Sequence, residues 1–192
     1  MKCFICNNNL DDFDKFYKCN KCGFINKKNI ISESKEKERY LHHQYDDSYT
    51  NYQKELLTPY FKDKSYKILD FGCGQQPILD KIFPNCNFVY YDKYFYENEF
   101  KSSLYDVILL NEVIEHILNP LEVLDELVKL LNENGYLLIH TMLYDENTNF
   151  KTWWYQRDIT HISFFNKETF EFIANKYNLK LSINNNFIVL KK

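Results

Sequence analysis

The stretch Lys67-Ile68-Leu69-Asp70-Phe71-Gly72-Cys73-Gly74-Gln75-Gln76-Pro77 decides the fold. An apolar pair, Ile68 and Leu69, precedes an acid, and two glycines follow at once in a Gly-x-Gly arrangement. The pattern predicts a strand over 66–71, a tight turn that brings the backbone close to a ligand, and a helix over 76–83. Strand, glycine turn and helix form the opening of a nucleotide-binding βαβ unit.

The following segments strengthen this prediction. A full dinucleotide-binding fingerprint has a third glycine, and Gln76-Pro77 occupy its place here. A second strand-like run over 87–91 ends in Asp92, and an acid there can accept hydrogen bonds from both ribose hydroxyls of an adenosine group. A third run over 106–110 leads into Glu112-Val113-Ile114-Glu115-His116. Because strands of this kind end at one edge of a parallel sheet, we expect these side chains to share a site.

Together these segments resemble the class I S-adenosylmethionine-dependent methyltransferases. The resemblance covers roughly residues 65–190 and includes Asn134-Gly135 before a fifth predicted strand over 136–141. It implies an α/β fold with a Rossmann-like, doubly wound, mostly parallel sheet, and S-adenosylmethionine as the cofactor. The predicted cofactor contacts come from the glycine turn and from the strand ends: Asp70, Gly72, Cys73, Gly74, Asp92, Lys93, Asn111 and Glu112.

The chain departs from the family between the second and third runs. Only 13 residues separate Asp92 from Asp106, where a usual member fits another helix, a strand and an acid that reads adenine. We therefore expect the sheet edge to be trimmed after the second strand, with irregular structure around Tyr94-Phe95-Tyr96. The adenine contact would then come from backbone groups near Tyr105 or from a stacked aromatic ring.

Four of the six cysteines follow the spacing Cys3-x2-Cys6-x12-Cys19-x2-Cys22. Two Cys-x-x-Cys hooks can close a tetrahedral Zn(Cys)4 site, so we predict a structural zinc ribbon over residues 1–30. The segment has few apolar residues, so the metal would supply its folding energy. A pair of redox dithiols is the alternative. Cys73 and Cys86 have no partner at metal spacing and are expected to be small packed residues.

Charge and hydropathy make nucleic-acid partners unexpected and argue against a membrane. The net charge of −3 gives no global case for binding nucleic acid or an anionic membrane. Residues 1–40 carry nine Lys/Arg and six Asp/Glu, which is a mild surplus of positive charge. The apolar runs are too short to cross a bilayer, and no secretory h-region follows Met1. We expect a cytoplasmic monomer or homodimer whose partner is a small-molecule acceptor, with no membrane contact.

Residues 31–64 are predicted to form a helical linker that lies over the cofactor as a lid. A charged helix begins near Ser32, and a second helix begins at a Ser48 cap and ends near Pro59. Between them stand His42 and His43, which the resemblance places near the substrate. Exposed surface histidines are the alternative.

The methyltransferase domain is expected over 65–192. Asn119 should cap a helix that Gly135 ends, and Asn166 should cap another. The last two strands, 179–183 and 187–190, are joined by an asparagine turn and predict an antiparallel hairpin.

An aromatic-rich segment follows the fifth predicted strand, where the chain passes the methyl-transfer face. His161 is the predicted general base, because imidazole accepts a proton near neutral pH. Aromatic rings here could exclude water and face a sulfonium cation. The candidate substrate residues are Trp153, Trp154, Tyr155, Arg157 and Asp158. Core tryptophans and a structural Arg157–Asp158 pair are the alternatives.

The predicted reaction is attack of an O, N or C nucleophile on the sulfonium methyl, with release of S-adenosylhomocysteine. A small metabolite or sugar is the expected acceptor. Three alternatives remain: an RNA or protein methyltransferase, a cofactor-binding zinc-ribbon adaptor without catalysis, and an NAD-type oxidoreductase.

Overall fold

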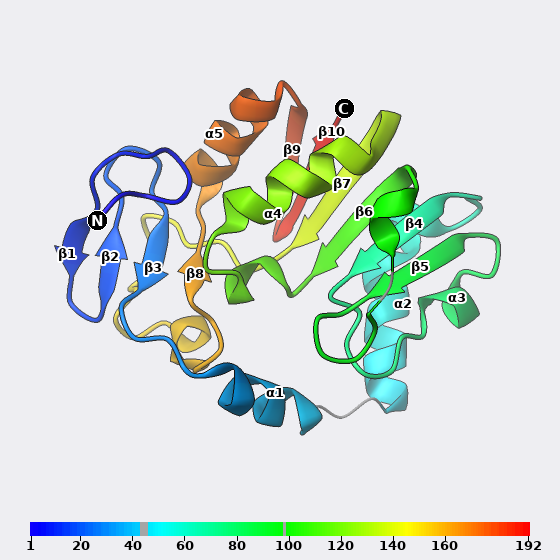
Figure 1. Ribbon diagram of the computed structural model, residues 1–192, viewed down its shortest axis with the longest axis horizontal. Coiled ribbons are helices and arrows are strands. Elements are labelled where there is room, and N and C mark those ends of the chain that lie inside the picture. The colour runs from blue at the N-terminus through cyan, green and yellow to red at the C-terminus, as the bar shows by residue number, and fades with distance from the viewer. Residues whose placement is uncertain (43–45, 98) are drawn as a thin grey trace.

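A six-stranded sheet forms the centre of the protein in a computed structural model that describes residues 1–42, 46–97 and 99–192. The strand order is β5-β4-β6-β7-β10-β9, with β4, β5, β6 and β7 parallel and the last two antiparallel (Figure 1). The strands are β4 (Lys67–Phe71), β5 (Asn87–Tyr91), β6 (Tyr105–Asn111), β7 (Leu131–His140), β9 (Lys180–Asn184) and β10 (Phe187–Lys191). The predicted Rossmann-like sheet with a C-terminal hairpin is confirmed.

One face of the sheet packs against α2 (Asp47–Phe61) and the short α3 (Leu79–Ile82). Leu57 and Phe61 of α2 are buried against Ile68 and Leu109, which point to this face because side chains alternate along a strand. The apolar runs that mark β4 and β6 in the sequence therefore supply both faces of a buried parallel sheet.

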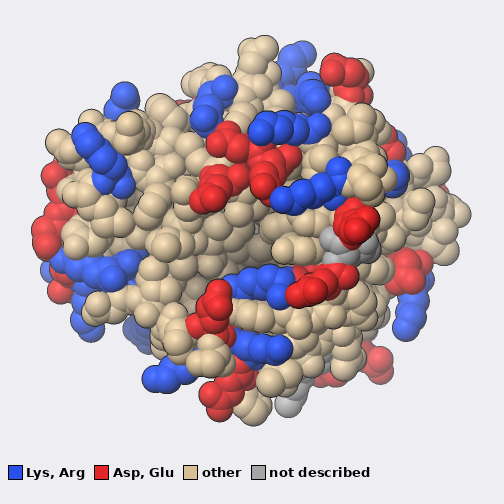
Figure 2. Space-filling view, in the orientation of Figure 1, with Lys and Arg blue, Asp and Glu red and all other residues tan. Residues whose placement is uncertain are grey.

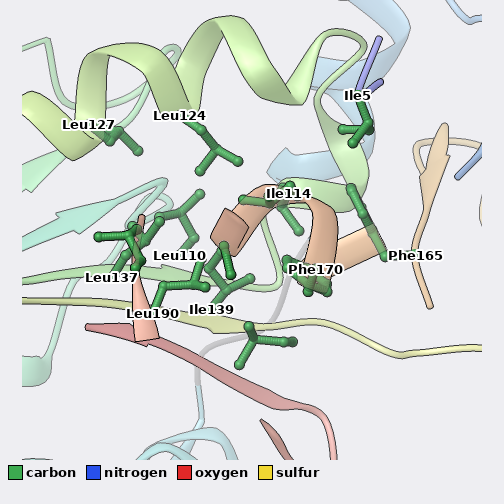
Figure 3. Packing of buried hydrophobic residues seen from close by; sticks show 14 of the residues in the cluster. Ile5, Leu110, Ile114, Leu124, Leu127, Leu137, Ile139, Phe165, Phe170 and Leu190 are labelled. Atoms are coloured by element: carbon green, nitrogen blue, oxygen red, sulfur yellow. The ribbon is translucent and has the colours of Figure 1, made fainter. Parts of the chain in front are cut away.

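The opposite face packs against α4 (Pro120–Leu127) and α5 (Lys167–Tyr177). Figure 3 shows Leu124 and Leu127 pointing from α4 toward Leu110 and Leu137 of the sheet. The predicted cap of α5 is confirmed, since the Asn166 side chain accepts a hydrogen bond from the Thr169 backbone N–H at 3.0 Å.

The sheet ends at β5, as the short connection after Asp92 predicts. A single 3-10 turn, η1 (Phe100–Ser102), precedes β6. The Phe100 ring lies 4.5 Å from the Tyr91 ring and 5.6 Å from the Phe71 ring, measured between centroids. The Tyr105 hydroxyl donates to the Phe100 carbonyl at 2.7 Å and is buried there. These aromatic rings thus pack together beside the trimmed edge of the sheet.

A second sheet joins the N-terminal segment to a short strand from the later part of the chain. Its order is β1 (Asp11–Phe13), β2 (Phe16–Lys18), β3 (Ile25–Lys27) and β8 (Ser163–Phe164). Ile25 pairs with Phe164, and Figure 1 shows the N-terminal strands lying beside β8. Phe16, Ile25 and Phe164 are buried in one aromatic-rich cluster. The segment 1–30, called the ribbon below, therefore shares its sheet with the C-terminal part of the chain.

Helix α1 (Glu33–Leu41) connects the ribbon to α2 and has no buried residue. It is held by polar contacts at its surface: Glu36 accepts hydrogen bonds from Lys93 and Tyr94, each at 2.8 Å. Within the described residues, no helix is long and apolar enough to span a bilayer.

The predicted cap of α2 was wrong, whereas its end lies close to the predicted Pro59. The carboxylate of Asp46, not Ser48, caps α2 by accepting from the Tyr49 backbone N–H at 3.0 Å. The helix also continues through Pro59 to Phe61, because its packing against the sheet outweighs the one hydrogen bond that proline removes.

Two further helix boundaries differ from the prediction. The helix after the glycine turn is four residues long, since Gln75, Gln76 and Pro77 extend the loop. Gly135 does not end a helix: α4 ends at Leu127, a 3-10 turn follows, and Gly135 lies within β7. A Cβ atom on Gly135 would stand 2.9 Å from the Asn132 carbonyl oxygen, so glycine serves a close backbone approach there.

Candidate functional site

A cavity of about 910 Å³ lies at the carboxyl ends of β4, β5 and β6. Open α/β sheets place their ligands at this edge. The space-filling view in Figure 2 shows the surface hollowed near the centre of this face, with charges of both signs around it. Residues from α1, α2 and the segment around His161 complete the walls.

The glycine turn forms the floor of the cavity. Gly72 and Gly74 have φ values of +84° and +71°, a region that favours glycine. A Cβ atom on Gly72 would stand 2.5 Å from a Val113 methyl group, so no larger residue fits without a shift. Cys73 also lines the cavity, and burial raises the pKa of its thiol, which makes it a poor nucleophile.

Asp92 lies beside this turn and lines the cavity. Its carboxylate accepts hydrogen bonds from the backbone N–H groups of Gly74 at 3.1 Å, Tyr94 at 2.8 Å and Phe95 at 3.2 Å. A carboxylate has about four acceptor positions. The turn therefore leaves capacity on Asp92 for one ribose hydroxyl, whereas the sequence suggested both.

Asp70 lies below the turn and does not line the large cavity. It borders a small neighbouring pocket with Gln76 and Pro77. Burial, with the charge of Asp92 as a second cause, raises the pKa of Asp70 to about 7. Its position favours support of the turn over direct contact with a ligand.

Lys93 stands at the rim of the cavity. Its ammonium forms an ion pair with Glu36 of α1 at 2.8 Å. Burial acts to raise the pKa of Glu36, but hydrogen bonds from Lys93 and Tyr94 outweigh it and lower that pKa below its ordinary value. This pair holds α1 at the rim of the cavity.

Asn111 and Glu112 end β6 and form a polar chain with β7. The Nδ1 atom of His140 lies 3.1 Å from Asn111 Oδ1 and 3.0 Å from Glu112 Oε1. Asn111 in turn donates to Gln53 of α2 at 2.8 Å. Burial would raise the pKa of Glu112, but His140 outweighs it and lowers that pKa, so the carboxylate is charged at neutral pH. Glu112 also has a φ of 54°, which is strained for this residue type.

Glu115 is fully buried next to the polar contacts of Asn111, Glu112 and His140. Its carboxylate accepts from the Tyr155 hydroxyl at 2.7 Å and from the Thr141 hydroxyl at 3.0 Å. Burial, and then the charge of Glu112, raises the pKa of Glu115 well above its ordinary value.

His116 and His161 lie side by side in the cavity wall, with ring centroids 4.8 Å apart. The Nδ1 atom of each ring forms a hydrogen bond with a backbone carbonyl. His116 bonds to Thr160 at 3.0 Å, and His161 bonds to Tyr155 at 2.8 Å. A carbonyl only accepts, so Nδ1 carries the proton in both rings and Nε2 is left as an acceptor. Burial, aided by His161, lowers the pKa of His116 to about 4, and burial lowers the pKa of His161 as well.

One nitrogen from each imidazole and a Glu115 oxygen lie within 4.8 Å of one another, so these residues form a possible metal-ligand set. Both oxygens of Glu115 already accept a hydroxyl hydrogen bond. The set is therefore better suited to proton transfer and hydrogen bonding than to holding an ion.

The aromatic segment after β7 divides into two parts. Asp158 lines the cavity, whereas Trp153, Trp154, Tyr155 and Arg157 do not. Trp153 packs among Phe150 and Phe164, and Trp154 is 63% exposed. Arg157 donates to the Thr152 carbonyl and does not pair with Asp158. Asp158 instead pairs with Arg39 of α1 at 3.3 Å.

His42 lines the cavity from the end of α1 with an exposed side chain. His43, the other histidine predicted to touch substrate, lies outside the described residues.

The four N-terminal cysteines form a second, separate site. Their sulfur atoms lie within 4.8 Å of one another, with Cys3–Cys22 at 3.6 Å and Cys6–Cys19 at 3.3 Å. In a tetrahedral site with Zn–S bonds of about 2.3 Å, the sulfur atoms lie about 3.8 Å from one another. Gly23 and Asn7, which follow the two hooks, both take positive φ values of 77° and 56°. Asn7 thus makes the same turn as the glycine, and the donor set fits zinc.

A comparison with known proteins shows the family to which most of this chain is similar. A sequence profile described as "Methyltransferase domain" matches residues 39–182. The chain belongs to the methyltransferase family. No curated protein sequence matches this methyltransferase. The resemblance predicted from the glycine turn and the strand ends is therefore confirmed by the profile.

Several solved structures share the fold of this methyltransferase. An O-methyltransferase family protein from Burkholderia thailandensis is 13% identical with a TM-score of 0.54, covering 81% of this chain and 61% of that chain. The pyocyanin biosynthetic protein PhzM is 12% identical with a TM-score of 0.59, covering 75% and 55%. The plantazolicin methyltransferase BpumL, solved with a pentazolic desmethylPZN analog and SAH, is 18% identical with a TM-score of 0.53, covering 84% and 91%. The methyltransferase spans less than two thirds of the first two, and at these identities the likeness shows the fold.

Sequence reasoning missed several residues of the methyltransferase site. Gln53, Tyr49 and Tyr52 reach the cavity from α2, and His140 reaches Glu112 from β7. The position of His140 at the end of a predicted strand could have indicated it, because neighbouring parallel strands end at the same edge. Nothing in the pattern of α2 marks Gln53 as facing the site.

Proposed function

We propose that this methyltransferase transfers the methyl group of S-adenosylmethionine to a small hydroxyl-bearing acceptor and releases S-adenosylhomocysteine. One observation carries the proposal: the Gly72–Gly74 turn and Asp92 share a single cavity with His116 and His161. When bound, the cofactor supplies an electrophilic methyl on a sulfonium. The glycine turn would bind its amino-acid part, and Asp92 one ribose hydroxyl.

The imidazole pair supports a hydroxylated acceptor. Both Nδ1 atoms donate to carbonyls, so each ring, both of which line the cavity, keeps Nε2 as a hydrogen-bond acceptor. A hydroxyl group can donate a hydrogen bond to such an acceptor. A carbonyl or carboxylate has no proton to donate, so its oxygen would face the Nε2 lone pairs. His161 is the proposed base, because its lowered pKa keeps it neutral and able to take the hydroxyl proton at neutral pH.

Other residues that line the cavity would exclude water and orient the bound cofactor. Tyr49 and Tyr52 from α2 and Tyr40 from α1 supply aromatic walls. Glu112, held charged by His140, would orient the cationic end of the cofactor. A cavity of about 910 Å³ is of the size that small-molecule sites have, which supports a small acceptor over RNA or protein.

The cysteine cluster supports a structural zinc ion held by Cys3, Cys6, Cys19 and Cys22. A closed four-sulfur shell leaves no open position for chemistry. The ion would instead supply folding energy to a ribbon whose strands are each three residues long.

Calorimetric titration with S-adenosylmethionine, S-adenosylhomocysteine and NAD tests the proposal. We expect micromolar binding of the first two and none of NAD. The absence of binding by both sulfur nucleosides would reject the function, and binding of NAD alone would favour an oxidoreductase. Once an acceptor is known, His161→Ala should slow turnover and leave S-adenosylhomocysteine affinity within about twofold, since the base acts on the acceptor.

A further inference from the structure

The ribbon strand β3 contacts the backbone of residues 158–164, called the acceptor segment because it carries His161. The Lys27 backbone N–H donates to the Ile162 carbonyl at 2.8 Å, and the buried Asn26 side chain donates to the same carbonyl at 3.0 Å. Asn26 and Ile25 then pair with β8. Residues that are 136 positions apart in sequence thus form one continuous set of hydrogen bonds.

The Lys27 side chain extends this contact to His161 itself. Its ammonium donates to the Asp158 carbonyl at 2.9 Å and to the His161 carbonyl at 3.2 Å. The His161 backbone N–H closes the same turn on the Asp158 carbonyl at 3.3 Å. An ammonium in water is well solvated, so turning it inward onto two carbonyls has a cost that its hydrogen bonds must offset. Because one ammonium bonds to both carbonyls, it holds the two ends of the turn from Asp158 to His161 together.

Lys27 is the last residue of β3, the strand that follows two of the four cysteines. Cys19 and Cys22 lie in the turn that joins β2 to β3. Within it, the Cys19 N–H donates to the Phe24 carbonyl at 2.8 Å and the Gly23 N–H donates to the Cys19 carbonyl at 2.9 Å. An ion held by the four sulfurs would fix this turn, and the register of β3 with it.

We propose that the ribbon is a positioning element of the acceptor site, in which Lys27 holds His161 in place and metal loading sets that placement. The proposal deepens the proposed function and rests on it for the role of His161 as base. The contacts themselves do not depend on the reaction. Lys27 is a positioning residue, since it touches the backbone that carries His161 and does not line the cavity.

Two adjacent lysines give a matched comparison. Lys27→Met removes the donors and keeps an apolar stem of similar length. Lys28→Met is the control, because the Lys28 ammonium bonds to Asp12 at 2.7 Å and to the Asp14 carbonyl at 2.5 Å inside the ribbon. With the zinc-loaded protein, we expect Lys27→Met to lower kcat by about 10- to 100-fold through misplacement of the base. Lys28→Met should not, and S-adenosylhomocysteine affinity should stay unchanged in both.

Fluorescence tests the same point without any acceptor. The chain has two tryptophans, Trp153 and Trp154. The Trp153 ring lies 5.1 Å from Tyr155 and 6.2 Å from Phe164, so it reports on the acceptor segment. In a Trp154→Phe background, Lys27→Met and removal of zinc by a chelator should both make Trp153 more accessible to acrylamide quenching. Lys28→Met should not.

The outcomes separate the two proposals. Equal Trp153 quenching and equal kcat in the two lysine variants would overturn the positioning role. A change in Trp153 with Lys27→Met alone supports that role even if no acceptor is ever turned over, and failed binding of S-adenosylhomocysteine counts against the proposed function only. Circular dichroism checks that each variant is folded. If Lys27→Met unfolds, Lys27→Leu, which also removes the donors, takes its place in the same comparison.

Discussion

The Tyr155 hydroxyl donates to Oε1 of the fully buried Glu115 at 2.7 Å and joins the aromatic segment after β7 to the residues that follow β6. The same hydroxyl lies 3.1 Å from the Thr141 hydroxyl and 3.3 Å from Glu112. One phenol therefore connects the wall that carries His161 with the strand end that carries Glu112.

Tyr155→Phe should lower the free energy of unfolding by about 1–3 kcal/mol, because a buried carboxyl loses a donor that no water replaces. Denaturant unfolding measures the change. Trp154→Phe is the control, since a side chain that is 63% exposed should alter stability by less than about 0.5 kcal/mol. Equal stability of the two variants would show that Glu115 does not need the phenol.

Asp92→Asn should weaken S-adenosylhomocysteine binding by about 1–3 kcal/mol, through the ribose hydroxyl and through the turn that the carboxylate holds. Calorimetry measures the affinity. Asp12→Asn, which alters an exposed ribbon carboxylate paired with Lys28, should leave it unchanged. Unchanged affinity in Asp92→Asn would remove this residue from the cofactor site.

The contribution of His116 to stability should fall as the pH drops from about 6.5 to about 4, its unfolded and folded pKa values, while the raised pKa values of Asp70 and Glu115 act in the opposite direction. In that window the unfolded chain binds a proton that the folded protein does not, so unfolding becomes easier at lower pH. The contribution of His116 is present in full above 6.5 and lost below 4, and amounts to about 3 kcal/mol. Compared with the wild type, His116→Asn should therefore gain stability as the pH falls through this window. The same pH dependence in His116→Asn and in the wild type would contradict the assignment.

Cys19→Ser should lose the bound zinc, about one equivalent in the wild type, because three sulfurs and a hydroxyl make a much weaker site. Elemental analysis of the purified protein measures the metal. Cys86→Ser provides the control, as Cys86 lies among Leu79 and Phe83, far from the cluster in the fold. Zinc retained in Cys19→Ser would mean that the four cysteines do not form the site.

Much of the sheet could be predicted, because a parallel strand leaves a short apolar run and the Gly72–Gly74 turn has a strong local signature. The trimmed edge was also predictable from chain length alone. Gly135 was misread, since a glycine after a helical pattern is typical of a C-cap and only the packing against Asn132 and Tyr105 shows the close approach. The β3–β8 pairing could not be predicted, because a strand of two residues has no periodicity.

The site was predictable in part for a similar reason. The glycine turn, Asp92 and Glu112 follow strands, so local sequence indicates them. The contacts of Tyr155 with Glu115 and of Lys27 with His161 join distant segments through backbone carbonyls and buried hydroxyls. Such contacts depend on three-dimensional packing and leave no spacing pattern in the chain.

The shared sheet also has a consequence for folding order. On the ribosome, β3 emerges long before its neighbour β8 at Ser163–Phe164, so its outer edge presents N–H and C=O groups with no strand partner during most of synthesis. Contacts of such long sequence separation form late. A ribbon that binds the proposed zinc ion could therefore do so before β8 is synthesised, and the acceptor segment could pair with β3 only afterwards.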